Sequence, residues 1–114
     1  MDSVTIKGRT FKFKIPNPWD GCAIFNMITT YDIPFGADIV VGIKSARRIM
    51  PKDELQTYLK LCLKYCYEQV NDKDIQVVDD DGGIGIIDAT APLFSGISTQ
   101  FILFFIHWLQ GEIS

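Results

Sequence analysis

The chain has one histidine, three cysteines and no apolar run long enough to cross a bilayer. A membrane-spanning helix needs roughly 20 apolar residues. The longest run here, FILFFIHWL at 101–109, has nine residues, eight of them apolar or aromatic, so we expect no membrane span. The first ten residues, MDSVTIKGRT, lack the charged start and apolar stretch of a signal peptide. An odd cysteine count without framework spacing favours free thiols in a reducing compartment, so the cytoplasm is the expected location.

The chain also lacks the motifs of common catalytic and ligand-binding sites. It has no GxGxxG and no GK[ST] sequence, so GGIG at 82–85 is not expected to bind phosphate. The acids of DDDGG at 79–83 are consecutive, unlike the alternating ligands of an EF-hand, and predict a charged hairpin turn. His107 has no serine, cysteine or carboxylate within its own helical turn to partner it. We therefore expect no enzyme, no catalytic residue and no cofactor.

A metal site would need all three cysteines and the single histidine of the chain to meet at one point. Cys62 and Cys66 are four residues apart on one face of a predicted helix, a spacing that can place two thiolates on one metal. The other two ligands would be Cys22 and His107, from separate elements. Because buried cysteine commonly acts as a small hydrophobic residue, we predict no metal site.

The size and composition indicate one globular domain over residues 1–114, with 47% apolar and 22% charged residues. The net charge of −3 is unevenly distributed. Residues 1–52 have eight Lys or Arg and four acids, a balance of +4, whereas residues 53–114 have three Lys and ten acids, a balance of −7. Such a division can steer head-to-tail self-association or docking to a charged partner.

Alternation and helix-start residues predict most of the secondary structure. VTIKGRTFKFKI at 4–15 alternates apolar and polar residues around a turn at Lys7-Gly8-Arg9, which predicts a β-hairpin. Residues 17–32 predict a helix with Asn17 as its N-cap. Residues 51–70 predict the clearest helix, with an apolar stripe, and a final helical region begins at Pro92 and runs to about 110.

Two stretches are harder to interpret. Ile39-Val40-Val41, within 37–50, could form a short strand or a buried loop. The two apolar runs of 75–87, on either side of the 79–83 turn, read as a second short hairpin. The expected fold is therefore α+β, with an N-terminal hairpin followed by about three main helices.

Two surfaces are candidates for binding. FILFFIHWL is apolar on every side of a helix, which exceeds what one small core needs, so Phe101, Phe104, Phe105 and Trp108 are the predicted protein-binding residues. Lys44, Arg47 and Arg48 form a basic patch that could contact a polyanion. An alternative function follows from the basic half of the chain, a small nucleic-acid-binding module. It would use Lys7, Arg9, Lys12, Lys14, Lys44, Arg47 and Arg48. Alternation opposes it, because it places Phe11 and Phe13 on the opposite face from the hairpin lysines.

The order of the predicted hairpin and helices along the chain is also informative. A basic-faced hairpin, VTIKGRTFKFKIP, has the pattern x-I-x-G-x-x-F/Y-x-h and is followed by an amphipathic helix. A long helix opened by MPKDELQTYLKLCLKY comes next, and APLFSGISTQFILFF, opened by a proline, includes the pair Phe104-Phe105. This arrangement resembles the tail assembly chaperones of long-tailed bacteriophages. The resemblance covers most of the chain but not 37–50 and 75–87.

The resemblance implies a non-enzymatic role in the host cytoplasm. Such chaperones coat the tape measure protein, a long apolar helical chain, and keep it soluble before the tail tube assembles around it. They often self-associate. The resemblance therefore implies a tape-measure-like protein client and a homo-oligomer as partners. The residues themselves argue against nucleic acid and a membrane as partners. An apolar groove suits a client of this kind, because an amphipathic helix binds by laying its apolar face into a groove.

Overall fold

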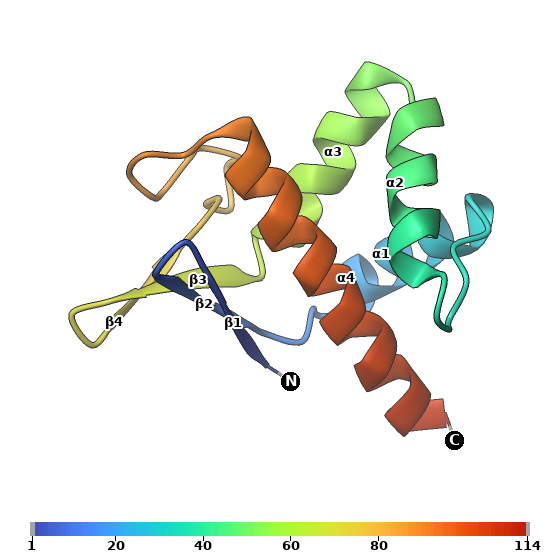
Figure 1. The fold of residues 1–114 in the computed structure, drawn as a ribbon, viewed down its shortest axis with the longest axis horizontal. Coiled ribbons are helices and arrows are strands. Elements are labelled where there is room, and N and C mark those ends of the chain that lie inside the picture. Colours follow the sequence, from blue (N-terminus) through green and yellow to red (C-terminus); the bar gives the residue numbers. More distant parts are fainter. Residues whose placement is uncertain (1, 114) are drawn as a thin grey trace.

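The computed structural model describes residues 2–113 of the chain, and the side chains of residues 2–111. It contains a four-stranded antiparallel sheet and four helices, which confirms the predicted α+β fold with an N-terminal hairpin. The elements in chain order are β1 (Ser3–Ile6), β2 (Arg9–Phe13), α1 (Pro18–Thr30), α2 (Ile39–Ile49), α3 (Lys52–Leu63), β3 (Cys66–Val70), β4 (Lys73–Gln76) and α4 (Ala91–Ile113). Figure 1 shows α4 lying between the sheet and the other helices.

The N-terminal hairpin forms as alternation predicts. Val4 is opposite Phe11, and the two-residue turn places both Lys7 and Gly8 at positive φ, the geometry of a type I′ turn. Phe11 and Phe13 are buried on one face of β2, whereas Lys12 points to the other face. The apolar face of the hairpin therefore belongs to the core.

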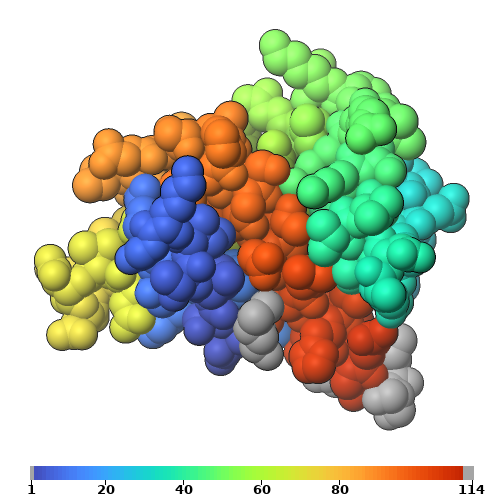
Figure 2. All heavy atoms as spheres, in the orientation of Figure 1, coloured from blue at the N-terminus to red at the C-terminus, as the bar shows by residue number. Residues whose placement is uncertain are grey.

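The sheet has the strand order β1-β2-β3-β4, and every neighbouring pair is antiparallel. The connection from β2 to β3 contains α1, α2 and α3, so the second half of the sheet is added after three helices. The molecule measures 37 × 33 × 27 Å. In Figures 1 and 2, the β3–β4 turn and α2 lie at opposite ends of the long axis.

Helix α1 begins where the sequence predicts. The Asn17 side chain accepts a hydrogen bond from the Asp20 backbone N–H at 2.9 Å, and Pro18 follows at the first helical position. Ile24 and Ile28 are its buried residues. The predicted N-cap is thus confirmed.

The interpretation of Ile39-Val40-Val41 as a short strand or a buried loop is wrong, because these residues begin α2. Its β-branched start suggested extended structure, but Ile43, Ala46 and Met50 recur at helical spacing and are all buried. A side chain at Gly42 would come within 2.4 Å of the Pro34 ring, so glycine permits close packing of the helix start on the preceding loop.

The predicted helix 51–70 is too long, because α3 ends at Leu63 and the chain turns into β3 at Cys66. Cys66 and Glu68 are buried and Tyr67 faces the other side, which is strand alternation. Pairing with β2 selects the strand, since Phe13 lies opposite Cys66. In the sequence alone, the spacing of the apolar residues around Cys66 fitted a helix as well as a strand.

The predicted turn at 79–83 forms, although its flanking runs make little sheet. Gly83 O accepts from the Asp79 N–H at 2.8 Å, and Val78 and Ile84 form a single antiparallel bridge. The longer second hairpin joins β3 to β4 through Asn71 and Asp72. Residue 75 lies in β4, at the end of the sheet.

Helix α4 has 23 residues, so the length argument against a membrane span is wrong. Residues 91–111 are long and apolar enough to cross a bilayer, with a mean hydropathy of 1.3. Half of the tested window is buried inside the protein, and the core helix of a soluble protein also satisfies these two criteria. Here α4 contacts β1, β2, α2 and α3, as a central core helix does.

Candidate protein-binding surface

The predicted binding residues Phe101, Phe104 and Phe105 belong to the core, so their assignment to an exposed surface is wrong. Phe101 and Phe105 are 0% exposed and Phe104 is 8% exposed. The physical reason is the apolar face of the sheet, since the Phe13 ring lies 6.0 Å from Phe101 and 5.5 Å from Phe104. One small domain does accommodate these phenylalanines.

Trp108 is the one member of the predicted set that reaches the surface. It is partly buried, and its ring lies 5.9 Å from that of Phe105, one turn earlier in α4. The apolar character of α4 thus continues from the core to the outside at this point.

Trp108 forms one wall of an apolar groove of about 400 Å³, here called the tryptophan groove. The groove lies between the linker that follows β2, one side of α1 and the end of α4. Its lining residues are Ile15, Pro16, Asn17, Pro18, Gly21, Cys22, Phe25, Phe105, Trp108 and Leu109. Phe105 supplies the buried end of the lining, and Ile15 and Phe25 are exposed at about two-fifths of their surface. Apolar side chains from three segments therefore converge on solvent.

The rim of the tryptophan groove adds two exposed side chains. Trp19, next to the lining residue Pro18, is 86% exposed. Cys22 is the only exposed cysteine of the three. A large aromatic side chain left in water beside an apolar groove is typical of a protein contact surface.

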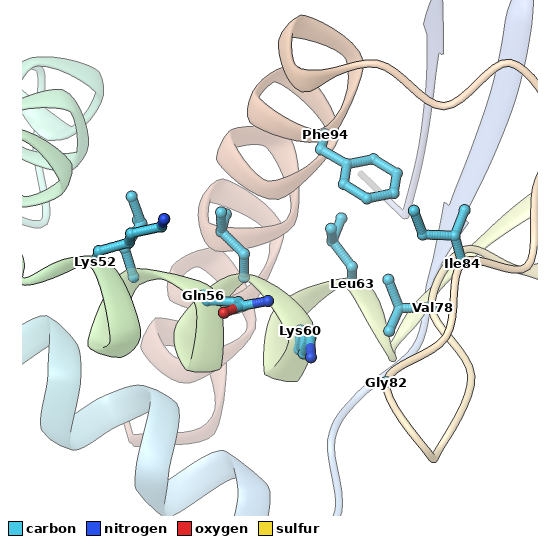
Figure 3. A pocket seen from close by; sticks show the side chains of 10 residues that line it. Lys52, Gln56, Lys60, Leu63, Val78, Gly82, Ile84 and Phe94 are labelled. Atoms are coloured by element: carbon cyan, nitrogen blue, oxygen red, sulfur yellow. The ribbon is translucent and has the colours of Figure 1, made fainter.

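A second groove, of about 460 Å³, lies between α3, the 78–84 loop and the start of α4; we call it the lysine-rimmed groove. Leucines of α3 form its floor, with Val78, Ile84 and Phe94 on the other side (Figure 3). Lys52 and Lys60 stand along its edge. The 79–81 acids belong to the same loop as Val78 and Ile84, so this groove has charges of both signs around it.

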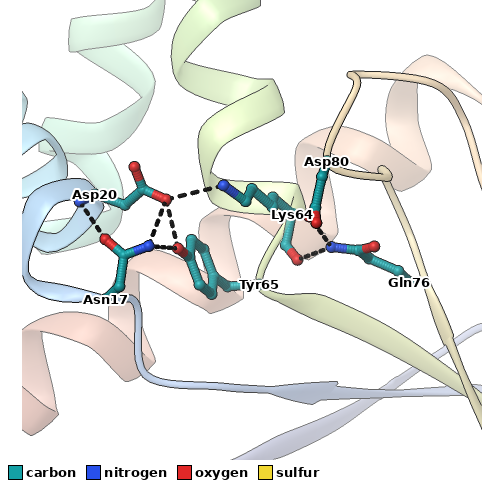
Figure 4. A network of polar contacts seen from close by, with 6 residues as sticks. All are labelled: Asn17, Asp20, Lys64, Tyr65, Gln76 and Asp80. Carbon is teal, nitrogen blue, oxygen red and sulfur yellow. Dashed lines mark hydrogen bonds and ion pairs between the residues drawn. The ribbon is translucent and has the colours of Figure 1, made fainter.

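A polar network fixes the α1 wall of the tryptophan groove (Figure 4). Asp20, in the first turn of α1, accepts hydrogen bonds from the Tyr65 hydroxyl and from Lys64 Nζ, the latter at 3.1 Å. The Asn17 amide donates to the Tyr65 hydroxyl at 3.0 Å. Gln76 continues the network by donating to the Lys64 carbonyl at 2.8 Å. The network joins the start of α1 to the junction between α3 and β3.

This network also sets the protonation of its members. The Tyr65 hydroxyl, and after it Lys64, hold the pKa of Asp20 below its usual value. The Asp20 carboxylate in turn raises the pKa of Lys64, and burial together with Asp20 raises the pKa of Tyr65. Asp20 is therefore a charged acceptor near neutral pH, and the groove wall carries an internally paired charge rather than an open one.

The predicted polyanion patch is divided by the fold. Arg47 turns inward and donates to the Ser95 Oγ at 3.0 Å and the Ser98 Oγ at 2.5 Å on α4. Lys44 and Arg48 are exposed and make no ion pair within the described part of the chain. Arg47 therefore attaches α2 to α4, and only its two neighbours present charge to solvent.

The hairpin cations of the nucleic-acid alternative are mostly engaged. Arg9 forms a two-pronged ion pair with Glu68, at 2.7 and 2.8 Å. Lys12 pairs with Asp74 at 3.6 Å, and Lys14 lies 4.1 Å from the centre of the Tyr67 ring. The aromatic residues of the hairpin are buried and present no ring for a base to stack on.

The predicted soft metal ligands are not brought together. Cys62 and Cys66 are buried, where burial raises the pKa of both thiols. Cys22 and His107 are exposed on α1 and α4. Among the side chains of residues 2–111, no three of histidine, cysteine, aspartate or glutamate gather in a geometry that could hold a metal ion.

Comparison with known protein families, curated proteins and solved structures gives no match to this chain. The resemblance to tail assembly chaperones therefore stays a prediction.

Sequence reasoning missed most of the tryptophan groove, although a signal for it was present. The buried stripe of α1 contains Ile24 and Ile28, and Trp19 and Phe25 lie off that stripe. A helix that packs on one core buries one apolar face, so a second apolar face is left for another contact. The excess of apolar surface lies on α1 and its preceding linker as well as on α4.

Proposed function

We propose that this chain is a non-enzymatic assembly factor that holds an apolar helical segment of another protein in the tryptophan groove. The observation that carries the proposal is the convergence of Ile15, Phe25 and Trp108 on solvent beside the exposed Trp19. Ile15 and Phe25 lie outside the core cluster, and Trp108 packs against that cluster while staying only partly buried.

The chemistry of the groove fits an amphipathic helix. Its lining is almost entirely apolar, and the nearest ionised pair, Asp20 with Lys64, is already satisfied internally. A helix presents apolar side chains at i, i+3, i+4 and i+7, which can enter such a groove without needing a charged partner. Recognition of this kind tolerates many sequences, as a chaperone for a long apolar chain requires.

The resemblance to tail assembly chaperones supports this proposal and supplies the client class. That client would be a tape-measure-like protein, held soluble until a tail tube assembles around it. The engaged cations of the hairpin and the inward-facing Arg47 favour this reading over a nucleic-acid-binding module.

The test uses a synthetic peptide of about 18 residues with leucine on one helical face and serine and glutamine on the other. Fluorescence polarisation of the labelled peptide measures its binding to the full chain. Trp108→Ser and Phe25→Ser should each weaken binding by about tenfold or more, the range of an interface hot spot. Ile49→Ser is the matched control, because Ile49 is equally apolar and 68% exposed but lies on α2.

An Ile84→Ser variant distinguishes the two grooves, since Ile84 lines only the lysine-rimmed one. Equal losses in the Trp108, Ile49 and Ile84 variants, with all three folded by circular dichroism, would refute the assignment. Absence of binding by the unmodified chain would refute the proposed function itself.

A further inference from the structure

The lysine-rimmed groove has an apolar floor on α3 and an apolar wall facing it. The apolar side chains of its lining are Leu55, Leu59, Leu63, Val78, Ile84 and Phe94. The three leucines follow one another at intervals of four residues, so they form one stripe along the helix. Ile84, on the facing wall, is 62% exposed. A groove of about 460 Å³ thus opens apolar surface to solvent at a point remote in sequence from the tryptophan groove.

A row of polar side chains runs beside the leucines on the same helix. Lys52, Gln56 and Lys60 are also four residues apart and line the groove (Figure 3). Among the described residues of the lining, the two lysines are the only charged ones, and neither makes an ion pair within the described chain. At a rise of about 1.5 Å per residue, they are separated by about 12 Å along α3. The groove therefore combines an apolar floor with two spaced cations on its edge.

The aspartate turn beside the groove only partly offsets these cations. The Asp79 carboxylate accepts two backbone N–H bonds within its own turn, at 2.9 and 2.8 Å. Asp80 accepts from a side-chain amide of β4 at 3.2 Å and interacts with the charge of Lys64. Asp53 and Asp81 are exposed and adjoin lining residues in the sequence, but neither is itself in the lining. They reduce the positive charge at the rim without occupying the groove.

We propose that the lysine-rimmed groove binds an acidic amphipathic helix of another protein. Apolar side chains of that helix pack between the α3 leucines and Ile84, and two of its carboxylates pair with Lys52 and Lys60. Residues seven positions apart on a helix are separated by about 10.5 Å, which is close to the spacing of the two lysines. A small amphiphile with one anionic head would pair with one lysine only, so the two spaced cations favour a helix.

This contact is distinct from the one proposed for the tryptophan groove. The two grooves share no lining residue, and the tryptophan groove has no charged residue in its described lining. One groove therefore suits a neutral apolar segment, and the other suits a segment that also has acids. The chain can hold both at once.

The test uses two labelled peptides of about 18 residues, each with leucine on one helical face. One has two glutamates two turns apart at the edge of that face, and the other has glutamine at both positions. Fluorescence polarisation is read with the full chain bearing Trp108→Ser, which weakens the tryptophan groove, at about 50 mM salt. The glutamate peptide should bind about tenfold or more tightly than the glutamine peptide. Ile84→Ser should weaken its binding by a similar factor.

Charge reversal on the rim should reverse the preference. Lys52→Glu with Lys60→Glu should lose the glutamate peptide and bind a peptide that has lysine at the same two positions. Asp81→Asn should strengthen binding of the glutamate peptide by about twofold, because it removes one opposing charge. Lys44→Glu with Lys73→Glu is the matched control, with the same change in net charge at exposed positions outside the groove. It should bind the glutamate peptide as its parent does.

A reversed variant that is unfolded by circular dichroism is replaced by Lys52→Gln with Lys60→Gln, which should also lose the glutamate peptide. Equal binding of the glutamate and glutamine peptides would overturn the proposal, as would an equal loss in the Lys44, Lys73 control. Displacement of the glutamate peptide by an equal concentration of dodecanoate would assign the groove to a small amphiphile instead. Self-association that the Lys52, Lys60 reversal abolishes would assign it to a second copy. The neutral peptide is measured separately on the unmodified chain, so each of these failures leaves the proposed function standing.

Discussion

Two consecutive turns of α4 carry similar side chains into opposite environments. Phe101 and Phe105 are enclosed by the sheet and by neighbouring helices, whereas Trp108 emerges between the β2–α1 linker and α1. The difference arises from what faces each turn, because the apolar face of β2 covers the earlier turn, whereas the later turn borders the tryptophan groove. An apolar segment thus changes role from core to candidate contact surface within seven residues. Substitution of its aromatic residues can separate the two roles.

The largest effect is expected from Phe101→Ala. Removal of a fully buried phenylalanine loses its transfer free energy and leaves a cavity, so the free energy of unfolding should fall by roughly 3–5 kcal/mol. Urea denaturation followed by circular dichroism measures the change. A loss below about 1 kcal/mol would mean that this turn of α4 is not in the core.

Trp108→Ala should have an intermediate effect on stability and a larger one on binding. Its ring is partly buried against Phe105, so we expect a loss of about 1–2 kcal/mol. The same denaturation experiment gives the value. A loss as great as that of Phe101→Ala would place Trp108 in the core and remove the contrast between the two turns.

Asp20→Asn tests the network behind the groove wall. The amide keeps the shape of the side chain but loses the charged acceptor for Tyr65 and Lys64, which we expect to cost about 1 kcal/mol near neutral pH. The pKa of Asp20 is lowered in the folded chain, so its stabilising contribution is present above the usual pKa of 3.8 and is lost as the pH falls through the folded value.

The measurement is urea denaturation of both proteins from about pH 6 to about pH 3. The two stabilities should converge as the pH falls. A difference that stays constant over this range would show that the Asp20 charge contributes nothing to the fold.

Trp19→Ala should have the smallest effect, within about 0.5 kcal/mol, because its side chain is almost entirely in water. Thermal unfolding provides the comparison with Trp108→Ala. A markedly larger loss would show that Trp19 packs on its own protomer and is not available to a partner.

Much of the fold follows from the sequence, because alternation and capping act over short distances. The turn at Lys7-Gly8, the Asn17 cap and the final helix are all local signals. The end of α3 was not predictable in this way, since Cys66 and Tyr67 fit a helical stripe until β2 is placed beside them. The β-branched start of α2 was interpreted as a strand or loop for a similar reason: tertiary packing overrode the local preference of these residues for extended structure.

The candidate site was predictable only in part. Composition indicated that apolar surface is in excess, and Trp108 is indeed at the edge of an exposed groove. Composition does not specify which side chains of an all-apolar helix face the sheet. That orientation determines why Phe105 is buried and Trp108 is partly exposed. The other groove residues come from the linker and α1, which tertiary packing alone brings together.

The most direct test of the central claim is the fluorescence of Trp108 itself. The chain has two tryptophans, so Trp19→Phe leaves Trp108 as the only indole emitter. Addition of the neutral leucine-faced peptide should shift the emission to shorter wavelength and reduce quenching by acrylamide, as the groove closes over the indole. Binding of the peptide with no change in the emission of Trp108 would contradict the account.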